Sequence, residues 1–327
     1  MRLARKGCSV ELLALTKYDC PNGSKAKFLM TVVAEYPKVL DAQVNMHKMF
    51  SKSAASSRAV PTPKVLGDKV PFWTPEVVGF NCKGMAPKDF MDDEQLAWFQ
   101  GQWIDLRNTV ANRITIINSA CKEKFGKRIE KGIINRPLDS FIMIRKVLTA
   151  TVCDMGWKNL WKLRSHGDAQ SDFQTISDLS KELYEAALSK ERYGEHIHLP
   201  FTTKEEREDD LKLAIMKSVA NCAAVSYRND ITDLQTCNKI VKKLIGSTPE
   251  HWGPFEHQGF SKAVCVDWES HYQGYQGSSC FTSIDTDLQA NFSNSGFYQL
   301  RKLWALERFN LTDFVLGLMW AQRGKNV

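Results

Sequence analysis

Apolar positions along the chain follow two spacings, one typical of strands and one typical of helices. The run KFLMTVVAEYP, from Lys27 to Pro37, is rich in apolar and β-branched side chains and ends at a proline, which predicts a strand. Between Leu96 and Phe125 the apolar residues recur every three or four positions, which predicts a long helix with one face towards the core. Asp92 and Gln95 have the spacing of a capping box at its start, and Gly126 can end it.

Three further stretches show the helical spacing. Apolar residues from Phe173 to Ala187 lie on one side of the first, and the others are LKLAIMKSVANCAAVSY (211–227) and LQTCNKIVKKLIG (234–246). Strand-like pieces such as KAVCVDW (262–268) follow, and the chain ends in a helix-like run rich in Leu, Trp and Phe. Because helices dominate and strands are few, we expect an α+β fold.

Charge and cysteine content narrow the class of protein. The formal net charge of +7 is spread along the chain without a basic tail or stripe, so it suits small anionic ligands at least as well as nucleic acid. No apolar run approaches the roughly 18 residues that a membrane span needs. The nine cysteines form no C-x-x-C pair, which favours reduced thiols in a cytoplasmic protein and argues against structural zinc. We therefore expect neither nucleic acid nor a membrane as a partner.

The segment VNMHKMFSKSAASSRAVPTPK (44–64) concentrates hydroxyls and cations. The hydroxyls and cations that crowd together there are Ser51, Ser53, Ser56, Ser57, His47, Lys48, Lys52 and Arg58. Serine hydroxyls and backbone N–H groups donate hydrogen bonds, and an arginine can grip a phosphate with two of them, so the segment could cradle an oxyanion. A Ser-rich surface turn explains the same composition equally well.

Two other polar clusters are candidates for a site. In EHWGPFEHQ, His251, Glu256 and His257 suggest a metal, but their spacing fits no strong zinc motif, which favours a structural polar corner. The two histidines of HIH (196–198) are a weaker metal candidate, since alternate residues of an extended segment face the same way but do not complete a site.

The third cluster, WKNLWKLRSHGDAQ (157–170), sets polar groups among tryptophans and leucines. Asn159, Arg164 and Gln170 are those polar groups. An arginine with apolar neighbours usually has a fixed partner, which is either a ligand or a group inside the fold.

Together these clusters resemble one family, the flavin-dependent thymidylate synthases (ThyX-like) in their bacteriophage branch. MHKMFSKSAASSRAVP is similar to that branch's serine-rich motif, LTATVCDMGWKNLWKLRSHGDAQ to its T-A-T-E-W segment, and HWGPFEHQ to its P-F-E-H-Q element. The matches run in one order from about Lys27 to Lys302. In cellular members the P-F-E-H element precedes the serine-rich motif, so the order here resembles a circular permutation.

The resemblance implies a fold with helices packed on a small, mostly antiparallel sheet. Residues 27–327 would form a single domain, with the Ser/Arg motif and the helical part in 27–200 and the P-F-E-H element in 201–327. Residues 1–26 would be an N-terminal extension. The family works as a homotetramer with active sites shared between subunits, so we expect an oligomer.

The resemblance also implies an activity and its residues. Family members make dTMP from dUMP with FAD, methylenetetrahydrofolate and NADPH, without an enzyme nucleophile. Substrate contacts would come from Gln43, Ser56, Ser57, Arg58, Arg136 and Arg164, with Ser56 and Arg164 catalytic. Flavin contacts would come from His47, Lys48, Ser51, Asn159, His251 and Glu256.

Several positions depart from the family pattern, mostly on the flavin side. They are Met46, Lys48, Ser53, Cys153, Met155 and Gly253. Lysine does not replace arginine at a bidentate site, so the departures predict altered, weakened or lost flavin binding. Two alternatives therefore stay open, namely a folate-dependent 5-hydroxymethylase of dUMP or dCMP and a catalytically inactive nucleotide-binding relative.

Overall fold

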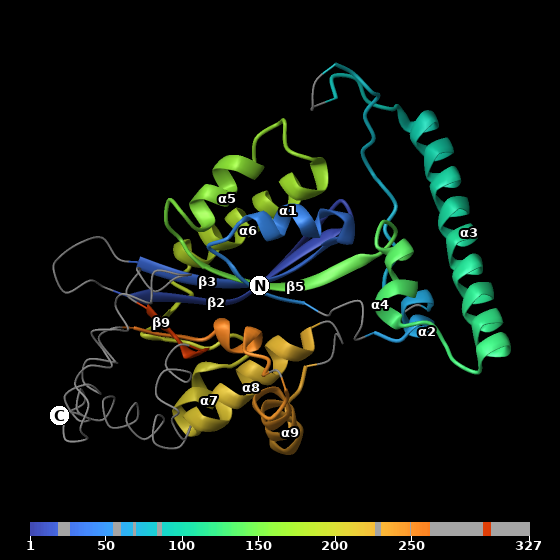
Figure 1. The fold of residues 1–327 in the computed structure, drawn as a ribbon. Helices are drawn as coiled ribbons and strands as arrows, with labels where there is room; N and C mark the ends of the chain where they lie inside the picture. The colour runs from blue at the N-terminus through green and yellow to red at the C-terminus, as the bar shows by residue number, and fades with distance from the viewer. Residues whose placement is uncertain are drawn as a thin grey trace, which may run out of the picture.

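The structure is a computed structural model that describes residues 1–18, 27–54, 60–67, 70–83, 87–225, 230–248, 250–261 and 297–301. Within these ranges, antiparallel sheets are combined with helices on both sides, as Figure 1 shows, and the α+β prediction is confirmed. Ser56, Ser57 and Arg58, the strand-like run at 262–268 and the C-terminal helix lie outside the described residues.

The main sheet contains six strands. Its order is β1 (Arg2–Arg5), β2 (Cys8–Tyr18), β3 (Lys27–Pro37), β5 (Met143–Thr151) and β4 (Ser51–Ala54), all antiparallel neighbours, while the short β6 (Gly194–Glu195) pairs in parallel with β2. The predicted strand at 27–37 is β3, with the same bounds. It is long and apolar because both of its faces are covered.

Residues 1–18 belong to this sheet. β2 pairs with β3 from Ser9↔Glu35 to Tyr18↔Lys27, and β1 pairs with β2 on the outer side. The first residues therefore contribute strands to the sheet that carries the site. The division of the chain into an extension and one domain stays a prediction.

One face of the sheet is covered by α1 (Asp41–Met46), α5 (Trp157–Arg164) and α6 (Ser171–Ser189), with η1 (Lys38–Leu40) leading into α1 (Figure 1). Met30, Val32 and Leu148 of the strands meet Trp157 and Phe173 of the helices in one buried cluster. The predicted apolar side from Phe173 to Ala187 is the buried side of α6. This packing fixes α5 and α6 against the strands.

The opposite face is covered by a second layer. It comprises α7 (Lys204–Asp209), α8 (Leu211–Ala224), α9 (Leu234–Ile245), η4 (Gly253–Glu256) and a three-stranded sheet of β7 (Ile197–His198), β8 (Gly259–Ser261) and β9 (Phe297–Gln299). α8 and α9 confirm the helices predicted at 211–227 and 234–246, although α8 ends earlier. Val33 and Val147 of the main sheet pack on Cys222 and Val225 at the end of α8.

The long helix α3 (Asp93–Phe125) begins and ends as the sequence predicts. Asp92 and Gln95 form the capping box, and Gly126 ends the helix with a left-handed φ of 69°. Its expected burial is met only in part: Ile114 is buried, and Trp103 and Val110 are half-buried. The helix stands at one side of the molecule (Figure 1), and its C-terminal half packs on α2 (Thr62–Leu66), α4 (Lys131–Ile134) and η2 (Arg136–Leu138). The periodicity correctly predicts an apolar face, but it does not predict whether another element packs on that face along its whole length. Leu106, Ile117 and Phe125 are exposed.

No helix in the described ranges is both long enough and apolar enough to cross a membrane.

Candidate functional site

The centre of the site is a contact between Arg164 and His47. Nε of Arg164, the last residue of α5, donates to Nε2 of His47, just after α1, across 3.2 Å. The guanidinium also lies over the ring of Phe173, 4.6 Å from its centroid. Only Nε of this guanidinium has a hydrogen-bond partner among the described residues, so its terminal nitrogens are available for a ligand.

His47 is held as a neutral ring. Burial, followed by the nearby cations Arg164 and Lys52, lowers the pKa of His47 to about 4. Because Nε2 accepts from Arg164, the single proton of the neutral ring is on Nδ1. Phe50 and Phe173 meet the imidazole edge to face. A neutral histidine inside an aromatic frame orients the arginine without adding charge.

Two more predicted residues lie at this junction of α1, α5 and α6. Gln43 stands four residues before His47, which is the spacing of side chains on one helical face. Nε2 of Gln43 donates to Oε1 of Gln170, the residue before α6, across 3.1 Å. Asn159 is half-buried on α5 and its side chain has no hydrogen-bond partner among the described residues.

A close backbone approach sets the position of α5. Gly156 precedes the helix, and a Cβ added there would lie 2.1 Å from the carbonyl oxygen of Thr151, at the end of β5. Only glycine allows this approach, which brings the start of α5 against the sheet. Sequence reasoning missed this position, for which a lone glycine before a helical run was the signal.

Ser51 of β4 and Glu256 of η4 are joined by hydrogen bonds to one side chain, that of Gln299. Nε2 of Gln299 donates both to Oγ of Ser51 and to the backbone carbonyl of Glu256, each across 2.9 Å. The Glu256 carboxylate forms an ion pair with Arg301. These two predicted flavin contacts are thus engaged within the fold. Lys48 and His251, by contrast, have exposed side chains.

Lys52, which the sequence analysis named only as one cation of the 44–64 segment, is a further functional candidate. Burial, then the charges of Lys146 and Lys48, lower the pKa of its amine to about 8. Nζ of Lys52 donates to the carbonyl of His47. A lysine that is partly neutral near physiological pH and touches the site is able to exchange a proton there.

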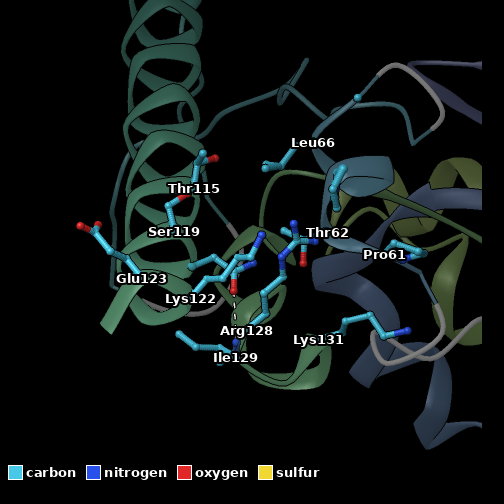
Figure 2. A pocket seen from close by; sticks show the side chains of 13 residues that line it. Pro61, Thr62, Leu66, Thr115, Ser119, Lys122, Glu123, Arg128, Ile129 and Lys131 are labelled. Carbon is cyan, nitrogen blue, oxygen red and sulfur yellow. Dashed lines mark hydrogen bonds between the residues drawn. The ribbon is translucent and has the colours of Figure 1, made fainter. Parts of the chain in front are cut away.

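Arg136 lies apart from this centre. It is exposed in η2, and no contact in the described part of the chain joins it to Arg164. Nearby, a cavity of about 830 Å³ lies between α2, α3 and α4 and is lined by Lys122, Arg128 and Lys131 together with Glu123. Figure 2 shows Lys122 and Arg128 reaching into the space between α3 and Thr62, while Glu123 points away. The cavity starts at Pro61, shortly after the Ser56–Arg58 segment.

The last candidates from the sequence are the possible metal ligands and the two histidines of the HIH segment. No three His, Cys, Asp or Glu side chains gather as a metal site in the described ranges. The expectation that His196 and His198 face the same way is wrong, because His196 has a left-handed φ of 62° and bonds through Nδ1 to Ser261, whereas His198 turns to the main sheet.

Comparisons with known proteins give partial likenesses. No family model matches the sequence, and no curated protein matches it. Over 47% of its length the chain is similar to thymidylate synthase X from Helicobacter pylori, a crystal structure with FAD and dUMP, at 13% identity and a TM-score of 0.30. That match spans 66% of the H. pylori chain, slightly less than two thirds.

A second solved structure is the UMP/dUMP methylase PolB from Streptomyces cacaoi, bound with 5-Br UMP. The similarity covers 58% of this chain and 97% of the other, at 12% identity and a TM-score of 0.40. At identities of 13% and 12% and TM-scores of 0.30 and 0.40, the two likenesses establish no shared activity, so the function is inferred from the residues of the site.

Proposed function

We propose that this protein is a flavin-dependent thymidylate synthase of the bacteriophage branch, circularly permuted, that methylates dUMP to dTMP. Arg164 carries the proposal. Its guanidinium is held by His47 and Phe173, and its terminal nitrogens have no partner among the described residues. A fixed guanidinium at a pyrimidine oxygen stabilises the negative charge that makes C5 of the ring nucleophilic.

The substrate side of the proposal uses the same junction. Gln43, four residues before His47, and its hydrogen-bond partner Gln170 offer amide groups with which to hold the polar edge of a base. Ser56, Ser57 and Arg58 would hold the phosphate, with Ser56 next to the reacting base. In a homotetramer with shared sites, Arg136 would reach the phosphate bound by a neighbouring subunit, which is consistent with its exposed position.

The cofactor side divides into contact residues and supporting residues. Lys48, Asn159 and His251 have side chains without hydrogen-bond partners in the described part of the chain, and they suit the carbonyl and ring-nitrogen acceptors of a flavin. His47, Ser51 and Glu256 are engaged internally and would support the flavin pocket. When bound, reduced FAD supplies the hydride, methylenetetrahydrofolate the one-carbon unit and NADPH the reducing equivalents.

The test is turnover of the full-length protein with dUMP, methylenetetrahydrofolate, FAD and NADPH, read by mass spectrometry of the nucleotide. We expect a product heavier by a methyl group and a flavin absorption band on the purified protein. A product heavier by a hydroxymethyl group, from dUMP or dCMP, would replace the proposal with the hydroxymethylase. Absence of any product and of bound flavin would leave the inactive nucleotide-binding relative.

A matched pair of variants ties the activity to Arg164. Arg164→Gln and Lys162→Gln each remove one positive charge from α5, but Lys162 is exposed. We expect Arg164→Gln to weaken dUMP binding by about tenfold or more, the value of at least one charge-assisted hydrogen bond. Equal effects of the two substitutions would show that Arg164 acts only through net charge.

A further inference from the structure

A line of buried polar side chains crosses the sheet beneath the site. Its members are Thr16, Thr31, Thr149 and Ser53 on β2, β3, β5 and β4, and His198 and His257 from the second layer. We call these six residues the Thr–His chain. All except Ser53 are buried.

The contacts are continuous from one end to the other. Thr16 Oγ1 meets His198 Nδ1 across 2.8 Å, and His198 Nε2 meets Thr31 Oγ1 across 2.6 Å. Thr31 Oγ1 meets Thr149 Oγ1 across 2.6 Å, in keeping with their direct pairing in the β3–β5 register. Thr149 Oγ1 then meets His257 Nδ1 across 2.8 Å.

The line ends at Ser53, whose Oγ lies 2.8 Å from His257 Nε2. Ser53 belongs to β4 and stands directly before the segment that contains Ser56, Ser57 and Arg58. Ser53 is half-buried, unlike the other five members of the Thr–His chain, so it is the member from which a ligand contact is expected.

Proton counting makes the Thr–His chain directional. A neutral imidazole has one donor nitrogen and one acceptor nitrogen, and each hydroxyl has one proton. Burial keeps both rings neutral, because it lowers the pKa of His198 and of His257 to about 3. If Thr31 donates its one proton to Thr149, it can only accept from His198, so His198 is the donor to Thr31. Thr149 then has its own proton to give, and its remaining partner is His257, so Thr149 donates to His257. Every bond therefore points the same way, and the two rings have the same tautomer.

The hydrogen bonds of Thr16, at the buried end of the Thr–His chain, determine in which direction all the bonds of the chain point. Thr16 is 2% exposed, and His198 is its only side-chain hydrogen-bond partner among the described residues. A second polar side chain, Arg207, is close to this end of the chain: a Cβ added at Gly194 would lie 3.9 Å both from Arg207 Nη2 and from Thr16 Oγ1. A guanidinium only donates hydrogen bonds, so Arg207 cannot accept one from the Thr16 hydroxyl. If His198 donated to Thr16, the Thr16 proton would be buried without an acceptor, at a cost of about 1–3 kcal/mol. Thr16 therefore donates to His198, and the protons of both rings are on Nε2.

We infer that the Thr–His chain presents the Ser53 hydroxyl as a donor to an oxygen atom of a ligand bound beside β4. His257 donates through Nε2 to Ser53 Oγ, which leaves the Ser53 proton free to point outward. The matching ligand group is an oxygen acceptor, either a phosphate oxygen or a ring carbonyl. His257 and Thr149 are positioning residues in this arrangement, since neither reaches the ligand. The inference rests on the proposed function for the identity of that ligand.

The tautomers are the direct test. In full-length protein labelled with ¹⁵N-histidine, long-range ¹H–¹⁵N spectra distinguish Nε2–H from Nδ1–H, and His198→Asn and His257→Asn assign the two signals. We expect two neutral rings, both with Nε2–H, in the ligand-free protein. Opposite tautomers, Nδ1–H on either ring, or a charged ring at neutral pH would overturn the inference.

Ligand contact is tested with three probes added separately: inorganic phosphate, dUMP and FAD. The probe that accepts from Ser53 should shift the His257 Nε2 signal, and Ser53→Ala should abolish that shift. A response to phosphate and dUMP identifies a phosphate oxygen, and a response to FAD alone identifies an oxygen atom of the flavin dinucleotide. If the His257 signal responds to none of them, Ser53 has no ligand role. Should dUMP fail to bind at all, the proposed function fails, while the tautomer result still decides the direction of the Thr–His chain.

A conservative pair separates positioning from folding. Thr149→Val removes the hydroxyl in the middle, so His257 is free to take the other tautomer and Ser53 to turn inward. Thr149→Ser keeps the hydroxyl. We expect Thr149→Val to weaken binding of the responding probe by about tenfold and to alter the His257 tautomer, and Thr149→Ser to restore both. Weaker binding with an unchanged tautomer in a folded Thr149→Val protein would contradict the inference.

Discussion

Arg164 and His47 are 117 positions apart in the sequence, and Nε of the arginine lies 3.2 Å from Nε2 of the histidine. The contact joins the end of α5 to the end of α1, on the face of the sheet that both helices cover. It fixes a half-buried guanidinium through a neutral partner, so the positive charge of Arg164 is kept for a ligand.

Removing Arg164 should raise the pKa of His47. The cation is the second cause, after burial, that lowers the pKa to about 4. In Arg164→Ala the ring keeps its burial but loses the repulsion, so its titration should move upward while staying below the ordinary value near 6.5. NMR titration of the His47 ring measures the change, with Lys162→Ala as the charge control. An unchanged His47 titration would mean that the arginine does not act on the ring.

Acid should unfold the protein through its buried histidines. The folded-state pKa values of His47, His198 and His257 are about 4, 3 and 3, below the value near 6.5 of an unfolded chain. Their contribution to stability is thus fully present above about pH 6.5 and is lost as the pH falls towards the folded values. Each ring should lower the free energy of unfolding by about 1.4 kcal/mol per pH unit in that window.

Urea unfolding at several pH values between neutral and mildly acidic measures this slope. His257→Asn should make this slope shallower by one proton. A slope equal to that of the unsubstituted protein would assign the acid sensitivity to other groups.

Lys52 should react with acylating reagents at lower pH than lysines ordinarily do. Its pKa of about 8, set by burial and by Lys146 and Lys48, leaves part of the amine neutral near neutral pH. Peptide mass spectrometry after brief labelling over a pH series should give a midpoint near 8 for Lys52. Lys48→Met should move that midpoint upward, because it removes one of the repelling charges. A midpoint near 10.5 would show an unperturbed amine.

Gly156→Ala should destabilise the protein and disturb α5. The new Cβ would lie 2.1 Å from the Thr151 carbonyl oxygen, so the start of the helix has to move. We expect a loss of about 2–4 kcal/mol in the free energy of unfolding, together with weaker dUMP binding as Arg164 shifts. Gly101→Ala is the control, because it lies within α3 with no atom within 4 Å of the new Cβ. That substitution should stabilise by about 0.5–1 kcal/mol, and a loss of similar size in both would remove the special role of Gly156.

Local signals in the sequence predicted elements well and their surroundings poorly. The bounds of β3 and the capping box of α3 follow from residues adjacent in the chain. The exposure of Leu106 and Phe125 on α3 does not, because periodicity defines a face without saying what packs on it. β2 was not predicted, because residues 1–26 were expected to be an extension, although Glu11 of β2 faces Arg145 of β5 on the sheet surface.

The site shows the same division. Arg164 was expected to have a fixed partner, but His47 as that partner depends on the way α1 and α5 meet on the sheet. The Thr–His chain depends on the register Thr31↔Thr149 and on the second layer, neither of which a linear sequence displays. Its only sequence signal is a threonine alone within the apolar strand β3 and a pair of threonines, Thr149 and Thr151, at the end of β5.

The pairing of β2 with β3 has a practical consequence for work on this protein. A shortened version that begins at Lys27 would leave β3 without its neighbour, and the backbone N–H and C=O groups of that long apolar strand would be open to other molecules. Such a sheet edge is a template for aggregation, and the missing Thr16 would also release His198 from its hydrogen bond. The opening residues thus protect the sheet from self-association.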